Sequence, residues 1–242
     1  MADLVADFPW LTTIGLVPLV GSVIVAALPA GRDELAKRLA LAFSGFTLAL
    51  VIVMAAGFDA GSNERFQFTE VYPWIPAFGV SYAVGVDGIA LVLIALTAVL
   101  TTVCVLASWH DADPAAQSAP SARPVKTFFA LLLVLETLMI GNFAATDVFL
   151  FYVFFEAVLI PIYFIIGSYG GPQRSYAAVK FLIYSLLGGL LMLAALVGVG
   201  IASPGGEQAF LFENLLGLDL DPNLERALFL GFFSAFAIKA PL

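Results

Sequence analysis

Long apolar runs with few or no charged residues limit this chain to a narrow class of folds. A helix that crosses the hydrocarbon core of a bilayer needs roughly 20 apolar residues. Four runs of about this length carry no charge: Pro9–Gly31, Leu39–Phe58, Gly88–Trp109 and Phe181–Gly206. Three others carry one charged residue each: Thr127–Thr146 with Glu136, Val148–Gln173 with Glu156 and Ala227–Leu242 with Lys239. The pattern predicts an all-α integral membrane protein with about seven transmembrane helices.

Composition supports a lipid environment and excludes several classes of function. The 242 residues are 62% hydrophobic and 12% charged, whereas soluble domains carry roughly 25% charged residues. A net charge of −8 leaves no basic surface for nucleic acid. The single cysteine, Cys104, cannot build a disulfide framework or a cysteine metal site. We therefore expect no metal and no bound cofactor in this chain.

Positive charge is distributed unevenly between alternate connections. One set holds Arg32, Lys37, Arg38, Arg123, Lys126, Arg174 and Lys180, and the other holds only Arg65 and Arg226 among many acidic residues. Lys and Arg favour cytoplasmic loops, so this bias predicts a multi-pass membrane protein with its N-terminus outside. Asp3 and Asp7 replace the basic start of a signal peptide, so we expect the first run to remain as a helix.

The chain divides into three segments. Residues 1–110 are expected to hold the first three helices, with an extracytoplasmic loop at 59–87 whose aromatic and proline content suits extended or hairpin structure. Residues 111–126 read as a cytoplasmic linker, and residues 127–242 as helices four to seven. Residues 203–226 are expected to form a loop with a short amphipathic piece.

Glu156 is the strongest candidate for function. It lies nine residues after Asp147, which places it about 13 Å into a helix at 1.5 Å per residue. A charge at the bilayer centre costs about 2.5–3.5 kcal/mol on insertion scales, so such residues are candidates for function. Pro161 removes a backbone N–H and is expected to loosen the helix near the carboxyl group. The alternative is a protonated glutamate that only binds two helices together.

Three other ionisable residues qualify. Lys239 lies about 22 Å along its helix from Leu224, and Pro241 is expected to break the helix after it. Glu136 also lies near mid-membrane, whereas Lys180 is close enough to Arg174 to reach the cytoplasmic interface. A lysine near the inner surface and a glutamate that bonds another helix remain the structural alternatives. Ionisable groups on different helices together suggest a proton relay.

The segment from Asp147 to Gly167, DVFLFYVFFEAVLIPIYFIIG, resembles the antiporter-like membrane subunits of the proton-pumping NADH:quinone oxidoreductase, respiratory complex I. Phe155 and Ile162 replace the usual Trp and Met of that motif. Three other stretches support the resemblance: Val84–Leu93, Ala178–Ser185 and Gly231–Pro241.

The resemblance implies the first half of a 14-helix fold with two inverted repeats and a broken seventh helix. It implies a translocase subunit that moves protons while other subunits transfer electrons from NADH to quinone. Glu156 and Lys239 match the family's ion pair, and Lys180 matches another family position. NADH, FMN, iron–sulfur clusters and quinone would bind to partner subunits. Other membrane subunits and the lipid bilayer are the implied partners.

Two other interpretations stay open on the sequence. A subunit of a multi-subunit cation/proton antiporter shares this fold and the glutamate–lysine pair. A membrane scaffold that transports nothing would use the same buried charges to hold its helices together.

Overall fold

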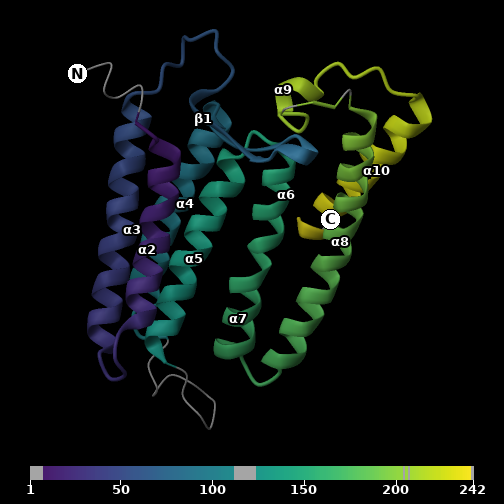
Figure 1. Ribbon diagram of the computed structural model, residues 1–242. Coiled ribbons are helices and arrows are strands. Elements are labelled where there is room, and N and C mark those ends of the chain that lie inside the picture. The colour runs from purple at the N-terminus through teal and green to yellow at the C-terminus, as the bar shows by residue number, and fades with distance from the viewer. Residues whose placement is uncertain (1–7, 112–123, 204, 207, 241–242) are drawn as a thin grey trace.

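The computed structural model describes residues 8–111, 124–203, 205–206 and 208–240. Its helices stand side by side, and their connections alternate between two ends of the bundle (Figure 1). In chain order the elements are α2 (Trp10–Ala27), α3 (Asp33–Ala56), β1 (Gln67–Ile75), η1 (Pro76–Phe78), β2 (Val80–Val86), α4 (Gly88–Ala107), α5 (Val125–Ala144), α6 (Val148–Ala157), α7 (Leu159–Tyr169), α8 (Arg174–Ala202), α9 (Phe212–Leu215) and α10 (Pro222–Lys239).

Six helical segments are long and apolar enough to cross a membrane, with α6 and α7 counted together as one. Large apolar side chains cover their outward faces; Ile89, Val92 and Ile201 are 73%, 64% and 81% exposed. In water such surfaces would associate, whereas lipid solvates them. The expected seventh span is α10, which carries Glu225, Arg226 and Lys239 and is not one of the six. The prediction of a helical membrane protein is confirmed.

Two helices begin well before their apolar runs. α3 starts at Asp33 and α8 at Arg174, ahead of the runs that begin at Leu39 and Phe181. Apolarity marks the part of a helix that lipid surrounds, and the backbone hydrogen bonds continue beyond it. α5 packs against α2, α3, α4, α6 and α7 and is the central helix of the bundle.

A two-stranded hairpin lies across one end of the bundle, here called the hairpin end (Figure 1). β1 and β2 pair antiparallel, with Tyr72 opposite Tyr82; of the extended or hairpin structure expected for residues 59–87, the chain forms a hairpin. Glu70 of β1 caps α2: its carboxylate accepts hydrogen bonds from the Leu11 amide at 2.8 Å, from the Thr12 amide at 3.2 Å and from the Thr12 hydroxyl. The first amides of a helix lack partners within it, so this carboxylate satisfies them.

Asp147 and Asp87 have the same role at two other helices. Asp147 is fully buried and accepts hydrogen bonds from the first amides of α6, at Phe149 (2.9 Å) and Leu150 (3.0 Å). Its other oxygen accepts from the Ser81 amide of β2 at 2.9 Å. Asp87 accepts from the α4 amide of Ala90 at 2.7 Å. Acidic residues at the hairpin end thus fasten helix starts to the hairpin.

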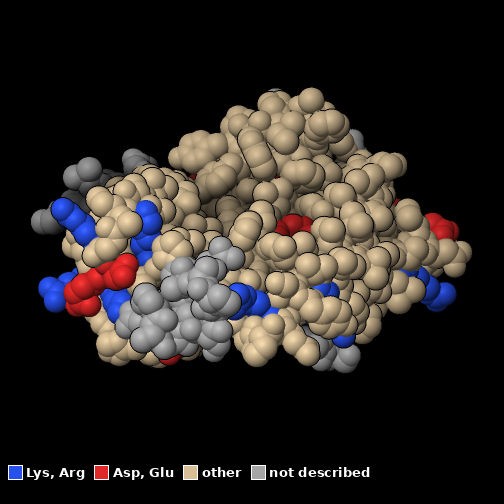
Figure 2. All heavy atoms as spheres, turned by 90° about the horizontal axis from the view of Figure 1, so that it is seen from below, with Lys and Arg blue, Asp and Glu red and all other residues tan. Residues whose placement is uncertain are grey.

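The opposite end of the bundle, here called the basic end, contains residues 28–32 and 170–173. Lys and Arg side chains gather around it, as Figure 2 shows from below. Lys126 donates hydrogen bonds to the carbonyls of Ala26 (2.9 Å) and Leu28 (2.5 Å) at the end of α2. A cation at a helix C-terminus is favourable because the last carbonyls lack partners within the helix.

Candidate functional site

Glu156 lies at the end of α6, one residue before its last. α6 ends at Ala157 and α7 begins at Leu159; Val158 between them keeps helical backbone angles (φ −55°, ψ −28°), so the two form one span. The Val158 amide bonds the carbonyl of Phe154 at 3.1 Å. Pro161, in the first turn of α7, has no amide to donate back to Ala157, which leaves that carbonyl without its usual helical partner.

The Glu156 carboxyl group lies directly against the backbone of α8. A methyl group built on Gly189 would overlap the carboxyl carbon and both oxygens of Glu156. The Oε1 atom is buried and has no hydrogen-bond partner in the described part of the chain. The side chain as a whole is half-buried. The Glu156 carboxyl group therefore lies in contact with the backbone of α8 at Gly189, without a hydrogen bond to its Oε1 atom.

Lys239 is the last residue of α10 and reaches across to α6. Its Nζ donates a hydrogen bond to the Phe155 carbonyl at 2.7 Å and lies 3.8 Å from the centroid of the Phe155 ring. Cation–π contact of this kind contributes about 0.5–2 kcal/mol. Across residues 8–240 as described, Glu156 and Lys239 form no ion pair within 4.0 Å. The ammonium group therefore lies at the residue next to Glu156 and not on its carboxylate.

Both groups lie at the middle of α8. Ile238 packs near Gly188, and Glu156 packs on Gly189; these glycines are central in a helix that runs from Arg174 to Ala202. The structure thus brings Glu156 and Lys239, which are distant in the sequence, to the same level of the bundle.

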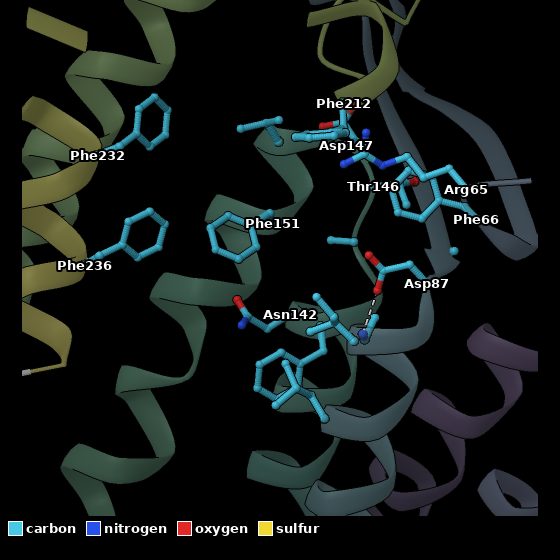
Figure 3. A pocket seen from close by; sticks show the side chains of 17 residues that line it. Arg65, Phe66, Asp87, Asn142, Thr146, Asp147, Phe151, Phe212, Phe232 and Phe236 are labelled. Carbon is cyan, nitrogen blue, oxygen red and sulfur yellow. Dashed lines mark hydrogen bonds between the residues drawn. The ribbon is translucent and has the colours of Figure 1, made fainter. Parts of the chain in front are cut away.

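Aromatic rings connect this pair to a cavity of about 440 Å³ toward the hairpin end. The Phe155 ring lies 5.6 Å from Phe151 and 5.9 Å from Phe236, and both of these residues also line the cavity. Figure 3 shows Phe232 and Phe236 of α10 pointing toward Phe151 of α6, with Asn142 of α5 nearby. Asn142 Oδ1 is buried and has no hydrogen-bond partner in the described residues.

Glu136 lies apart from the pair, within α5. It is 1% exposed, and neither carboxyl oxygen has a hydrogen-bond partner in the segments that the structure describes. The alternative of a carboxyl group that hydrogen-bonds another helix has no support in this geometry.

Lys180 faces away from Glu156. It is exposed, and its Nζ lies 5.8 Å from the centroid of the Tyr176 ring. Lys180 precedes Gly189 by nine residues, which is about two and a half helical turns and places the two on opposite faces of α8. Pro241, the expected helix break, lies outside the described residues.

Sequence reasoning missed three parts of this site. No pattern in the sequence indicates that Gly189 lies against the Glu156 carboxyl group, and none marks the Phe155 carbonyl as the partner of Lys239. The caps formed by Asp87 and Asp147 could have been found, because an acidic residue directly before an apolar run is a helix-start signal. In the described residues, no group of three or more His, Cys, Asp and Glu side chains is arranged to hold a metal ion.

Comparison with known proteins is consistent with this geometry. Residues 145–242 match the family model of the NADH:quinone oxidoreductase/Mrp antiporter transmembrane region. NADH-quinone oxidoreductase subunit M of Mycobacterium tuberculosis is 45% identical, covering 98% of this chain and 48% of that protein. Subunit M of Rhodobacter capsulatus is 37% identical, covering 96% of this chain and 45% of that protein. The chain thus spans about half the length of these relatives.

Solved structures show the same fold. A chain of respiratory complex I from Thermus thermophilus aligns with a TM-score of 0.80 and 30% identity, covering 96% of this chain and 44% of that one. A chain of the Mrp complex from Dietzia aligns with a TM-score of 0.75 but 17% identity, covering 95% of this chain and 23% of that one, and shows the fold alone. The motif around Glu156 predicts subunit M in particular, and the relatives of that name confirm the resemblance. This chain is similar over nearly its whole length to the N-terminal half of the subunit M proteins of NADH-quinone oxidoreductase.

Proposed function

We propose that this chain forms the first half of a membrane subunit of the proton-translocating NADH:quinone oxidoreductase. Other membrane subunits are its partners, in a bacterial plasma membrane with the N-terminus outside. Electron transfer from NADH to quinone takes place in partner subunits, which bind NADH, FMN, iron–sulfur clusters and quinone. This chain moves protons and carries no redox centre. Residues 1–110, 111–126 and 127–242 are its three parts.

The observation that carries the proposal is the position of Lys239 beside Glu156 at the middle of α8. Two ionisable groups at that level cost several kcal/mol in a membrane. A role in holding helices together explains these two groups poorly, because Glu156 Oε1 has no hydrogen-bond partner in the described residues. A site whose ammonium and carboxyl groups lie close together without an ion pair is suited to exchange a proton.

The lysine side chain supplies the moving part. Phe155 and Glu156 are adjacent, so rotation of the flexible lysine stem can carry the ammonium from the Phe155 carbonyl to the Glu156 carboxylate. Lys239 pairs with an ionised Glu156. When a proton neutralises the carboxylate, the ammonium returns to the carbonyl and can release its own proton to water. Transfer of the Glu156 proton to the neutral amine then restores both charges. Pro161 leaves the carbonyl of Ala157, the residue after Glu156, without its usual helical hydrogen bond, which loosens the helix beside both α6 groups.

The other candidate residues have lesser roles in this proposal. Glu136 is buried in α5 and serves as a further proton-holding site. Lys180 does not join the pair, because it lies on the opposite face of α8. Pro241 follows the end of α10 and would free the carbonyl of Ala237.

Glu156→Gln and Lys239→Ala test the proposal in the full-length subunit within the assembled complex. We expect each variant to lose most proton pumping while the complex still assembles, and Glu156→Asp to keep part of it. Proton uptake per NADH oxidised, measured in membrane vesicles, gives the comparison. Glu213→Gln, an exposed glutamate of α9, is the matched control and should pump normally. Wild-type stoichiometry in Glu156→Gln would refute the proposal and assign Glu156 to packing.

A second candidate is a subunit of a cation/proton antiporter, which the fold likeness to the Mrp complex supports. The same vesicles separate the two functions: a sodium gradient would drive proton movement without NADH in an antiporter. The vesicle measurement also addresses the scaffold interpretation, in which removing either charge impairs assembly and leaves pumping per assembled complex unchanged.

A further inference from the structure

Two adjacent glycines at the middle of α8 face two different helices. Gly189 faces α6, where the Glu156 carboxyl group occupies the space that a Cβ would fill. Gly188 faces α10, where an added Cβ would lie 3.2 Å from Cγ2 of Ile238. Ile238 directly precedes Lys239. Two consecutive residues of α8 therefore lie against Glu156 and against Ile238, the residue before Lys239.

The contact at Gly189 is the more demanding of the two. At Gly188 an added Cβ would lie 3.2 to 3.4 Å from Cγ2, Cβ and Cδ1 of Ile238, so α10 would have to give by only a few tenths of an ångström. At Gly189 an added Cβ would overlap the carboxyl carbon and both carboxyl oxygens of Glu156, so the carboxyl group would have to move away. Glycine inside a helix costs about 1 kcal/mol relative to alanine, so the position lowers helix stability to make room for a carboxyl group.

Steric contact with α8, and no hydrogen bond to Oε1, sets the position of the Glu156 carboxyl group. Its Oε1 is buried and accepts no hydrogen bond from the described residues, and Lys239 donates to the Phe155 carbonyl. The free space over Gly189 is therefore what allows the carboxyl to lie against α8 while the ammonium lies at Phe155.

We propose that Gly189 is a positioning residue for proton transfer: its bare backbone receives the Glu156 carboxyl group and sets its place relative to Lys239. This inference rests on the proposed function of the pair. Any side chain at position 189 would push the carboxyl off α8 and change the geometry of its exchange with the lysine.

Gly189→Ala, made in the full-length subunit of the assembled complex, tests the inference. A displacement of about 1 Å at a reacting group can lower a rate by about a hundredfold, so we expect the pumping rate to fall by at least about tenfold, with a shifted pH profile. The double variant Gly189→Ala/Glu156→Asp should recover to the rate of Glu156→Asp alone, because aspartate is one methylene shorter and clears the added methyl group. A double variant no better than Gly189→Ala would overturn the inference.

Two matched glycine variants control for the added methyl group. Gly188→Ala should lose far less activity than Gly189→Ala, since only Ile238 must shift. Gly45→Ala in α3 adds a methyl group where no atom of the described residues lies within 4 Å, and should pump normally. Equal losses in Gly188→Ala and Gly189→Ala would show a general packing defect and overturn the inference.

An infrared measurement separates this inference from the proposed function. The C=O stretching band that disappears in Glu156→Gln identifies the Glu156 carboxyl, and we expect that band to shift in Gly189→Ala. If Glu156→Gln pumps normally, the proposed function fails, but a shifted band still supports Gly189 as the seat of the carboxyl. An unshifted band together with wild-type pumping in Gly189→Ala would overturn the positioning role.

Discussion

Lys239 donates its hydrogen bond to the backbone carbonyl of Phe155, at 2.7 Å, and not to the carboxylate of the next residue. The ammonium also lies over the Phe155 ring, 3.8 Å from its centroid. Phe155 therefore supplies a second place for the lysine, one residue from Glu156. A lysine with two neighbouring places is suited to move between them during proton transfer.

The Phe155 ring should therefore affect the pumping rate, although it neither donates nor accepts a proton. Phe155→Leu keeps the carbonyl but removes a cation–π contact of about 0.5–2 kcal/mol, which shifts the balance between the two lysine positions. We expect pumping to fall by about two- to thirtyfold, since about 1.4 kcal/mol equals a factor of ten. Phe155→Trp should pump at least as well as wild type. Phe229→Leu, on the exposed side of α10, is the control; normal pumping in Phe155→Leu would exclude a role for the ring.

The orientation of the bundle can be measured with reporter fusions. The basic end should face the cytoplasm and the hairpin end the outside, because Lys and Arg favour cytoplasmic loops. Alkaline phosphatase fused after Pro120 should be inactive, and the enzyme fused after Gly206 should be active. The reverse pattern would place the N-terminus inside.

Asp147 should contribute strongly to stability. Asp147→Ala leaves the amides of Ser81, Phe149 and Leu150 without their acceptor, and a buried unsatisfied group costs about 1–3 kcal/mol. We expect a loss of about 3 kcal/mol or more, seen as a lower thermal midpoint of the complex in detergent. Asp221→Ala, at the exposed start of α10, should cost only about 1 kcal/mol. Equal midpoints for these two variants would contradict the role of Asp147 in joining α6 to the hairpin.

The same carboxyl group predicts a pH dependence. Burial raises the pKa of Asp147 above its ordinary value of 3.8, and the hydrogen bonds from Ser81, Leu150 and Phe149 oppose that rise only in part. A carboxyl whose pKa is raised on folding stabilises the protein below 3.8, and this contribution is lost as pH rises through the folded pKa. The stability of wild type relative to Asp147→Asn should therefore decrease as pH rises from about 4. A difference that grows with pH would show that the hydrogen bonds outweigh burial.

The sequence by itself determined that the protein is a helical membrane protein, approximately where its spans lie, and that basic residues gather at one end of the bundle and acidic residues at the other. These follow from local chemistry, because the thickness of the hydrocarbon core and the cost of a charge within it act on each segment separately. The hairpin in residues 59–87 was also predictable from its aromatic and proline content. Helix ends were less so, since α3 and α8 extend beyond their apolar runs.

Only the tertiary structure decided which groups meet. Glu156, Gly189 and Lys239 are far apart in the sequence, and no local pattern indicates that a glycine of α8 receives the carboxyl or that Lys239 reaches the Phe155 carbonyl. The same packing turns Lys180 away from the pair. The rotation of each helix about its axis sets these contacts, and it depends on how side chains of neighbouring helices fit together, which a residue's depth in the membrane does not specify.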